Sequence, residues 1–269
     1  MIVRRRLILA VLLVLLSGCS SVPTSFTPER PIPPKEFSHQ VFDELLRAHV
    51  RDGVVNYPAI KPDPRLQTYI GQLDRVDPNG LSGRRDRLAF WINAYNAFAI
   101  QGILDGYSPT TLFGRYRYFI ARTYRIGGAE IDLYDLEQKI LIPEFREPRI
   151  HFAIVCASSS CPRLHSWAYR ADRLEEQLEQ SARDFINDPS RNRFDHDRKV
   201  AYLSMIFKWF EDDFVAHSGS LAGYVKRYVT DPQLARDLEV GAYRVEFLEY
   251  DWSLNGPPPT RESHARLPQ

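Results

Sequence analysis

The chain has 269 residues, of which 44% are hydrophobic and 26% charged, and its 35 basic residues nearly balance 34 acidic ones. This composition excludes a disordered or fibrous protein, and the balanced charge gives no sign of a nucleic-acid partner or of electrostatic binding to a membrane. About 220 residues lie between an N-terminal proline-rich segment and a proline-rich tail, which is enough for one hydrophobic core.

The chain begins with the pattern of a secretory signal. Three arginines at positions 4–6 precede an apolar run at residues 7–16, which is shorter than the roughly 20 residues of a spanning helix. The following "LSGC" resembles the lipobox of bacterial lipoproteins. This resemblance implies that residues 1–18 are removed and that several acyl chains on Cys19 hold the protein at a membrane. The alternative is that the apolar run is an uncleaved membrane anchor. Under either interpretation, the rest of the chain faces the periplasm.

The residues after Cys19 predict a location and a spacer. In bacterial lipoproteins a residue other than aspartate after the lipidated cysteine, here Ser20, usually accompanies sorting to the outer membrane. Residues 19–36 contain five prolines, which favours an extended spacer, and residues 256–269 form a similar tail. We therefore expect one domain, residues 37–255, tethered to the outer membrane on its periplasmic face.

Hydrophobic periodicity and turn residues within this domain predict a mixture of helices and strands. Helices are expected at residues 37–50, 65–76, 84–104, 132–141, 171–187, 204–215 and 221–229. A hairpin is expected at residues 116–133, turning at Gly127-Gly128, and strands are expected at residues 150–156, 199–204 and 243–252. Ser38 and Asp132 are candidate helix caps. The pattern favours an α+β fold, a single mixed domain with a central buried helix and a small, mainly antiparallel sheet.

The segment at residues 84–104 is apolar around nearly its whole circumference, which is typical of a helix buried on all sides. Asn93 and Asn96 lie one turn apart on it, and each buried amide without a partner costs on the order of 1 to 3 kcal/mol. They either tie neighbouring loops together, or orient a catalytic side chain or line a pocket. Asn93 is the first choice for a catalytic role, and Asn96 is a candidate binding residue.

The stretch "RIHFAIVCASSSCPRL" holds the only two cysteines of the predicted domain, Cys156 and Cys161. Four residues separate them, so a hairpin places them at a distance that a disulfide accepts, and the periplasm permits the bond. Alternatively, Cys161 is a nucleophile. Because Pro162 favours a helix start, the dipole and free amides of that helix would lower the pKa of the thiol. The backbone amides of Ser158, Ser159 and Ser160 would then bind an oxyanion.

A zinc site formed by the two cysteines with His151 and His165 is the weakest interpretation, because the spacing matches no common zinc pattern. Two other residues carry alternatives. Lys208 lies on a predicted solvated helix face or reaches into a pocket as a binding residue. Asp251, at the end of the last predicted strand, orients a histidine or caps the tail.

Four blocks, "LAFWINAYNAF", "PRIHFAIVCASSSCPRL", "LSMIFKWFEDDF" and "YDWSLN", resemble the domain-of-unknown-function family 547 (DUF547), from about Val54 to Asn255. The resemblance implies no settled activity. His165 departs from the family pattern, which weakens the zinc interpretation further. The positions that the resemblance emphasises are Asn93, Asn96, His151, Cys156, Cys161, Lys208 and Asp251.

The leading functional hypothesis is a cysteine-dependent hydrolase or acyl transferase that acts on cell-envelope material. Cys161 is its nucleophile and His151 its general base, and Asn93 or Asp251 orients the imidazole, following the roles found in papain-like enzymes. The rival is a non-catalytic binding or scaffold lipoprotein with a Cys156–Cys161 disulfide. A redox role would use a bridge that opens and closes. We expect no cofactor, no metal and no nucleic acid, and a partner that is the membrane together with a protein or peptidoglycan.

Overall fold

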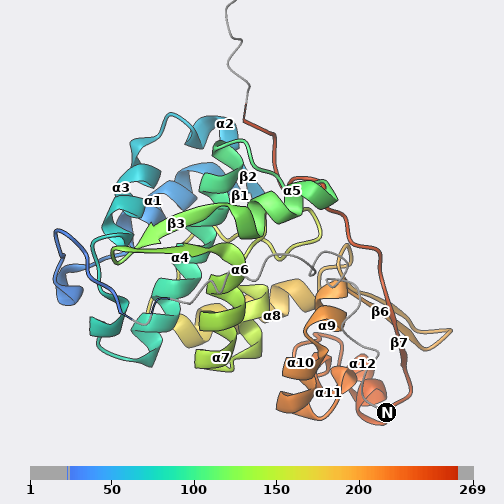
Figure 1. The fold of residues 1–269 in the computed structure, drawn as a ribbon. Coiled ribbons are helices and arrows are strands. Elements are labelled where there is room, and N and C mark those ends of the chain that lie inside the picture. Colours follow the sequence, from blue (N-terminus) through green and yellow to red (C-terminus); the bar gives the residue numbers. More distant parts are fainter. Residues whose placement is uncertain (1–22, 24, 260–269) are drawn as a thin grey trace, which may run out of the picture.

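A computed structural model describes residue 23 and residues 25–259 (Figure 1). The predicted signal sequence, Cys19 and Ser20 lie outside the described residues, as does most of the predicted tail. Helix α4 (Arg84–Leu104) runs through the larger of two hydrophobic cores, and its side chains from Leu88 to Ile100 are all buried. The prediction of a central helix buried on all sides is confirmed.

Short elements pack around α4 on several sides (Figure 1). The two-stranded pair β1 and β2 is antiparallel. The helical and strand elements of this half are α1 (Gln40–His49), β1 (Val50–Arg51), β2 (Val54–Val55), α2 (Tyr57–Ile60), α3 (Pro64–Leu73), α5 (Leu112–Tyr116), α6 (Leu133–Asp135) and α7 (Ile142–Phe145). The 3-10 turns are η2 (Pro34–Glu36), η3 (Pro78–Gly80) and η6 (Pro148–Phe152), and the π-helical turns are η4 (Arg117–Ala121) and η5 (Leu136–Leu141).

The predicted hairpin is confirmed. Strands β3 (Thr123–Ile126) and β4 (Ala129–Asp132) pair antiparallel, and the turn between them is Gly127-Gly128. Both glycines have positive φ, 58° and 82°, which a two-residue hairpin turn requires and which side chains disfavour. The side chain of Asp132 then caps the next helix by accepting a hydrogen bond from the Asp135 amide at 2.7 Å.

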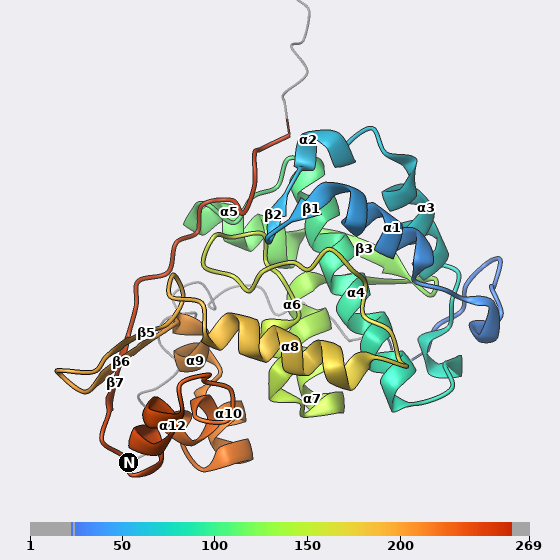
Figure 2. The same cartoon turned by 180° about the vertical axis from the view of Figure 1, so that it is seen from behind.

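A second hydrophobic core is built mainly from the C-terminal third of the chain. Helix α8 (Leu174–Ile186) joins the cores, because Leu174 and Leu178 pack in the first while Phe185 and Ile186 pack in the second. Figure 2 shows α8 between α4 and the C-terminal helices. The other elements are α9 (Met205–Trp209), α10 (Glu211–Ser218), α11 (Leu221–Val225), α12 (Pro232–Glu239), β5 (Arg193–Asp195), β6 (Val200–Leu203) and β7 (Arg244–Phe247).

The three-stranded sheet has the order β5-β6-β7, with β5 antiparallel and β7 parallel to β6. The architecture is therefore a single mixed α+β domain, as predicted, with its strands divided among three small sheets. Within the described residues, no helix combines the length and apolarity needed to cross a bilayer.

The predicted strand at residues 150–156 is wrong. Pro148 begins the 3-10 turn η6, and the Glu147 side chain caps it by accepting from the Arg149 amide. The next residues are irregular because a side chain, and not a neighbouring strand, satisfies their backbone. Asn96 donates to the carbonyl of Ala153 at 3.0 Å and accepts from the amide of Val155 at 2.8 Å.

Two helical glycines give a matched test of packing around α4. A Cβ at Gly102 would lie 2.6 Å from the Tyr124 hydroxyl and 2.9 Å from the Tyr118 ring, whereas a Cβ at Gly71 in α3 meets nothing within 4 Å. We expect Gly102→Ala to lower the free energy of unfolding by about 1 to 3 kcal/mol through overpacking. Gly71→Ala is expected to leave it unchanged or raise it by up to about 1 kcal/mol. Urea denaturation measures both, and equal effects would contradict the packing.

Candidate functional site

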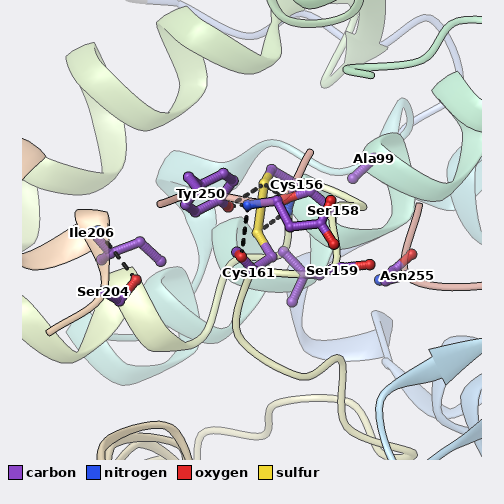
Figure 3. Close-up of a disulfide and its surroundings, with 12 residues drawn as sticks. Ala99, Cys156, Ser158, Ser159, Cys161, Ser204, Ile206, Tyr250 and Asn255 are labelled. Atoms are coloured by element: carbon purple, nitrogen blue, oxygen red, sulfur yellow. Dashed lines mark hydrogen bonds between the residues drawn. A yellow bond between two sulfur atoms is a disulfide. The ribbon is translucent and has the colours of Figure 1, made fainter. Parts of the chain in front are cut away.

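The two cysteines of the domain lie in a tight loop, residues 156–161, and are joined as a disulfide (Figure 3). Their Cα atoms are 6.2 Å apart, within the range that a disulfide accepts. The loop is closed by a hydrogen bond from the Cys161 amide to the Ser158 carbonyl at 3.1 Å, and Ala157 adopts a positive φ of 62°. Cys161 is buried, whereas Cys156 is partly exposed.

The helix predicted to begin after Cys161 is absent. Residues 162–173 form no helix, and α8 begins only at Leu174. Pro162 therefore lies in irregular chain, and the sulfur of Cys161 is not at the start of a helix. The amide that points at the Cys161 sulfur belongs to Cys156, at 2.9 Å.

The last segment of the domain holds this loop from one side. The amide of Ser159 donates to the Ser253 carbonyl at 2.7 Å, and the amide of Ser160 donates to the Asp251 carbonyl at 3.2 Å. The Ser160 hydroxyl also accepts from the Asp251 amide at 2.9 Å. The amides of Ser159 and Ser160, which the sequence offered to an oxyanion, are therefore already paired with backbone carbonyls.

Arg191 holds the loop from the other side. Its guanidinium donates to the carbonyls of Cys161, at 2.7 Å, and Ser159, at 3.0 Å. The same group forms an ion pair with the buried carboxylate of Asp188, at 2.5 Å. The Arg191 side chain is partly buried, and its two carbonyl bonds and its ion pair fix the guanidinium, so it holds the backbone of the loop in place.

Two hydroxyl groups lie against the more exposed sulfur. The sulfur of Cys156 is 3.1 Å from the Ser158 hydroxyl and 3.3 Å from the Tyr250 hydroxyl, and these two hydroxyls are 2.9 Å apart (Figure 3). Burial raises the pKa of Tyr250, so its hydroxyl remains protonated and can donate.

His151 is buried in η6 on the side of the second core. Its Nε2 lies 2.8 Å from a carboxylate oxygen of Asp213 in α10, and its ring stacks on Phe210 with centroids 3.9 Å apart. Burial lowers the pKa of His151, and the hydrogen bond to Asp213 opposes this shift. Within the described residues Nδ1 is buried without a hydrogen-bond partner.

The four residues predicted to be catalytic are not brought together. Neither sulfur has a histidine among its hydrogen-bond partners in the described part of the chain. Asn93 uses both ends of its amide on the backbone of Tyr169, at 2.8 and 2.9 Å. The Asp251 carboxylate accepts from the Ser253 amide and caps the tail segment.

The structure also shows residues that the sequence interpretation missed. Asp213, which follows Lys208 by five residues, is the partner of His151, and Tyr250 is the partner of the disulfide. The available signal was the aromatic spacing in "KWFEDDF", because Phe210 and Phe214 flank Asp213 and both contact the His151 ring. Asp213 follows Phe210 by three residues, a spacing that lets two side chains share one face of a helical segment.

Glu137 interacts electrostatically both with Asp213, the partner of His151, and with Tyr250 beside the disulfide. It is half-buried in η5, where Tyr95 of α4 donates a hydroxyl to it at 3.3 Å. Burial raises the pKa of Glu137 to about 7, the hydrogen bonds from Tyr95 and Gln138 lower it, and the charge of Asp213 adds to the increase. Glu137 in turn contributes to the raised pKa of Tyr250.

Lys208 is exposed on α9, with its ammonium group 5.4 Å from the centroid of the Phe247 ring. It borders an open depression of about 730 Å³ with Glu211, Val215 and Phe247. Within the described residues, no group of three or more histidine, cysteine and acidic side chains could hold a metal ion.

The raised pKa of Glu137 predicts a pH-dependent stability. Between 4.5 and about 7 the folded protein keeps a proton on Glu137 that the unfolded chain has released, so its free energy of unfolding falls as pH rises through this range. Glu137→Gln removes this loss. We therefore compare the free energy of unfolding of the variant with that of the native chain at each pH. We expect this difference, variant minus native, to be larger at pH 8 than at pH 4.5 by on the order of 1 to 3 kcal/mol.

Urea unfolding at the two pH values measures this difference. Glu249→Gln, which alters an exposed carboxylate, is the matched control and should change stability equally at both. A Glu137→Gln variant whose stability difference from the native chain is the same at both pH values would contradict the assignment.

The comparisons with known proteins bear on the region that contains this site. A model of the family described as "Protein of unknown function, DUF547" matches residues 78–186, which include α4, the hairpin, the disulfide loop and α8. No curated protein and no solved structure matches the chain. Over residues 78–186 the chain is therefore similar to the DUF547 family.

Proposed function

We propose that this chain is a non-catalytic lipoprotein of the cell envelope that presents a fixed binding surface to a protein or peptidoglycan partner. The proposal rests on the disulfide: the sulfur of Cys161 is bonded to Cys156 and is therefore not a free thiol that could act as a nucleophile. In this proposal the disulfide sets the local shape of the loop and does no chemistry.

The alternative, a thiol hydrolase or acyl transferase, has less support. It needs a thiolate with a base in hydrogen-bond reach and a third group that orients the base. His151 is instead bonded to Asp213, and the amide of Asn93 is bonded at both ends to Tyr169. Reduction of the disulfide would release a thiol, but it would not supply a base.

The proposed location rests on the N-terminal sequence. A lipidated Cys19 would hold the domain at the outer membrane, and the periplasm is a compartment in which a disulfide persists. The bond closes a loop of only six residues, so the chain-entropy model gives it a stabilisation of about 2 kcal/mol. This value is modest, which agrees with a role in local shape.

The thiol state tests the non-catalytic proposal. We expect that alkylation of intact cells before lysis, followed by mass spectrometry, finds Cys156 and Cys161 unmodified until a reductant is added. The control is Cys161→Ser, which leaves the partly exposed Cys156 without its partner and should be alkylated directly. Alkylation of Cys161 near neutral pH without reductant would reject the proposal and favour the thiol enzyme.

Metabolic labelling tests the proposed anchor. We expect a palmitate analogue to label the full chain in a bacterial host and the label to disappear in Cys19→Ala, because the acyl chains are attached at this residue. The matched control is the double variant Cys156→Ala, Cys161→Ala, which should keep the label. Equal labelling of the native chain and Cys19→Ala would disprove lipidation at this position.

A further inference from the structure

One face of the domain carries a cluster of exposed apolar side chains. Leu112, Phe113, Tyr116 and Ile120 are 66%, 70%, 41% and 40% exposed, and they belong to the consecutive elements α5 and η4. Their spacing places them along one side of the helical segment. We call these four residues the α5 patch.

The segment that carries the α5 patch is positively charged. Residues 107–125 contain four arginines and no acidic residue. Two of them are neutralised, because Arg122 pairs with Asp105 and Arg125 pairs with Asp74. The other two, Arg115 and Arg117, have no ion pair in the described part of the chain.

Aromatic side chains extend the α5 patch toward the last segment of the domain. The guanidinium of Arg115 lies 4.5 Å from the centroid of the Trp252 ring, and Trp252 stacks on the partly exposed Trp209 at 5.8 Å. Both cartoon views show α5 beside this segment (Figures 1 and 2). Exposed apolar residues, unpaired arginines and tryptophans are the combination that lies in the headgroup region of a bilayer.

The predicted anchor precedes a segment that packs on the hairpin next to the α5 patch. The ring of Phe26 lies against Gly127 at the turn of the hairpin, and the other end of β3 follows η4 directly. Cys19 precedes Phe26 by seven residues, a length of chain that spans at most about 25 Å. A lipid on Cys19 would therefore hold Phe26 within about 25 Å of the bilayer, and the hairpin beside Phe26 is joined to the segment that carries the α5 patch.

We propose that the α5 patch docks on a phospholipid surface that contains anionic headgroups. Phe113 and Leu112 enter the boundary of the acyl chains, and Arg115 and Arg117 contact lipid phosphates. This inference rests on the proposed lipidation of Cys19, and it adds an orientation of the domain, with the α5 patch toward the membrane.

Fluorescence quenching tests the orientation. The full chain and the variant Phe113→Trp are extracted from bacterial membranes and reconstituted into vesicles of phosphatidylcholine and phosphatidylglycerol, with and without brominated acyl chains. Subtraction of the native signal isolates the new tryptophan. We expect brominated lipid to quench Trp at position 113, because the α5 patch inserts.

The matched control is Val240→Trp, since Val240 is also apolar, is 78% exposed and lies just after α12, outside the α5 patch. It should not be quenched. Adding Arg115→Gln and Arg117→Gln to Phe113→Trp should reduce the ratio of docked to undocked domain by about fivefold for each arginine in the anionic vesicles. It should have little effect in pure phosphatidylcholine.

The outcomes separate the inference from the anchor. Quenching at position 113 alone supports docking. Absence of quenching in a chain that still floats with the vesicles overturns docking but leaves the anchor intact, and it would assign the α5 patch to a protein partner. Equal quenching at positions 113 and 240 also overturns it. A chain that does not float contradicts the anchor itself.

Discussion

The arrangement of the site depends on the amide of Asn96. Residues 153–155 leave the 3-10 turn η6 with no strand beside them, and the buried side chain of Asn96 supplies both a donor and an acceptor for their backbone. Asn93, one turn earlier on α4, does the same for the backbone of Tyr169. Each unpaired buried group would cost about 1 to 3 kcal/mol, so α4 can support irregular chain in a core only because it carries these amides. The positions of His151 on one side and Cys156 on the other follow from this support.

A series of buried and half-buried ionisable groups extends from the second core to the disulfide. His151 and Asp213 lie at one end, Glu137 and Tyr95 in the middle, and Tyr250 at the disulfide. Buried groups of this kind hold one arrangement only when each has its partner, because a missing partner leaves a charge or dipole in a medium of low polarity. Polar contacts therefore help to specify which distant elements pack together, in addition to the burial of apolar surface. They pair η6 with α10, and the disulfide loop with the last segment of the domain.

The sequence predicted what periodicity and local turn chemistry determine. The bounds of α4, the Gly127-Gly128 hairpin and the Asp132 cap all follow from patterns within one element. The strand predicted at residues 150–156 failed because an apolar run is compatible with any buried conformation, and the choice was made by a side chain on another element. The prediction of a helix after Cys161 was wrong for a related reason. Proline is compatible with the first position of a helix, but it does not by itself cause a helix to form there. The partner of a side chain on a distant element, such as Asp213 for His151, is not specified by a local pattern, and the aromatic residues beside Asp213 indicate only that this part of the chain packs against a neighbour.

The last segment of the domain ties the disulfide loop to the proposed membrane surface. Tyr250 contacts the Cys156 sulfur, Trp252 contacts Arg115 at the α5 patch, and Asn255 accepts from the buried Tyr57 hydroxyl at 2.7 Å. Because these three contacts fall within six residues, the position of Trp252 is set by the same backbone that closes the disulfide loop. A disulfide that closes a short loop contributes little to global stability. It does limit the motion of the loop, and of the last segment that is hydrogen-bonded to the loop. In this arrangement the bond would keep Trp252 in place beside Arg115, which gives the disulfide a physical role under the proposed non-catalytic function.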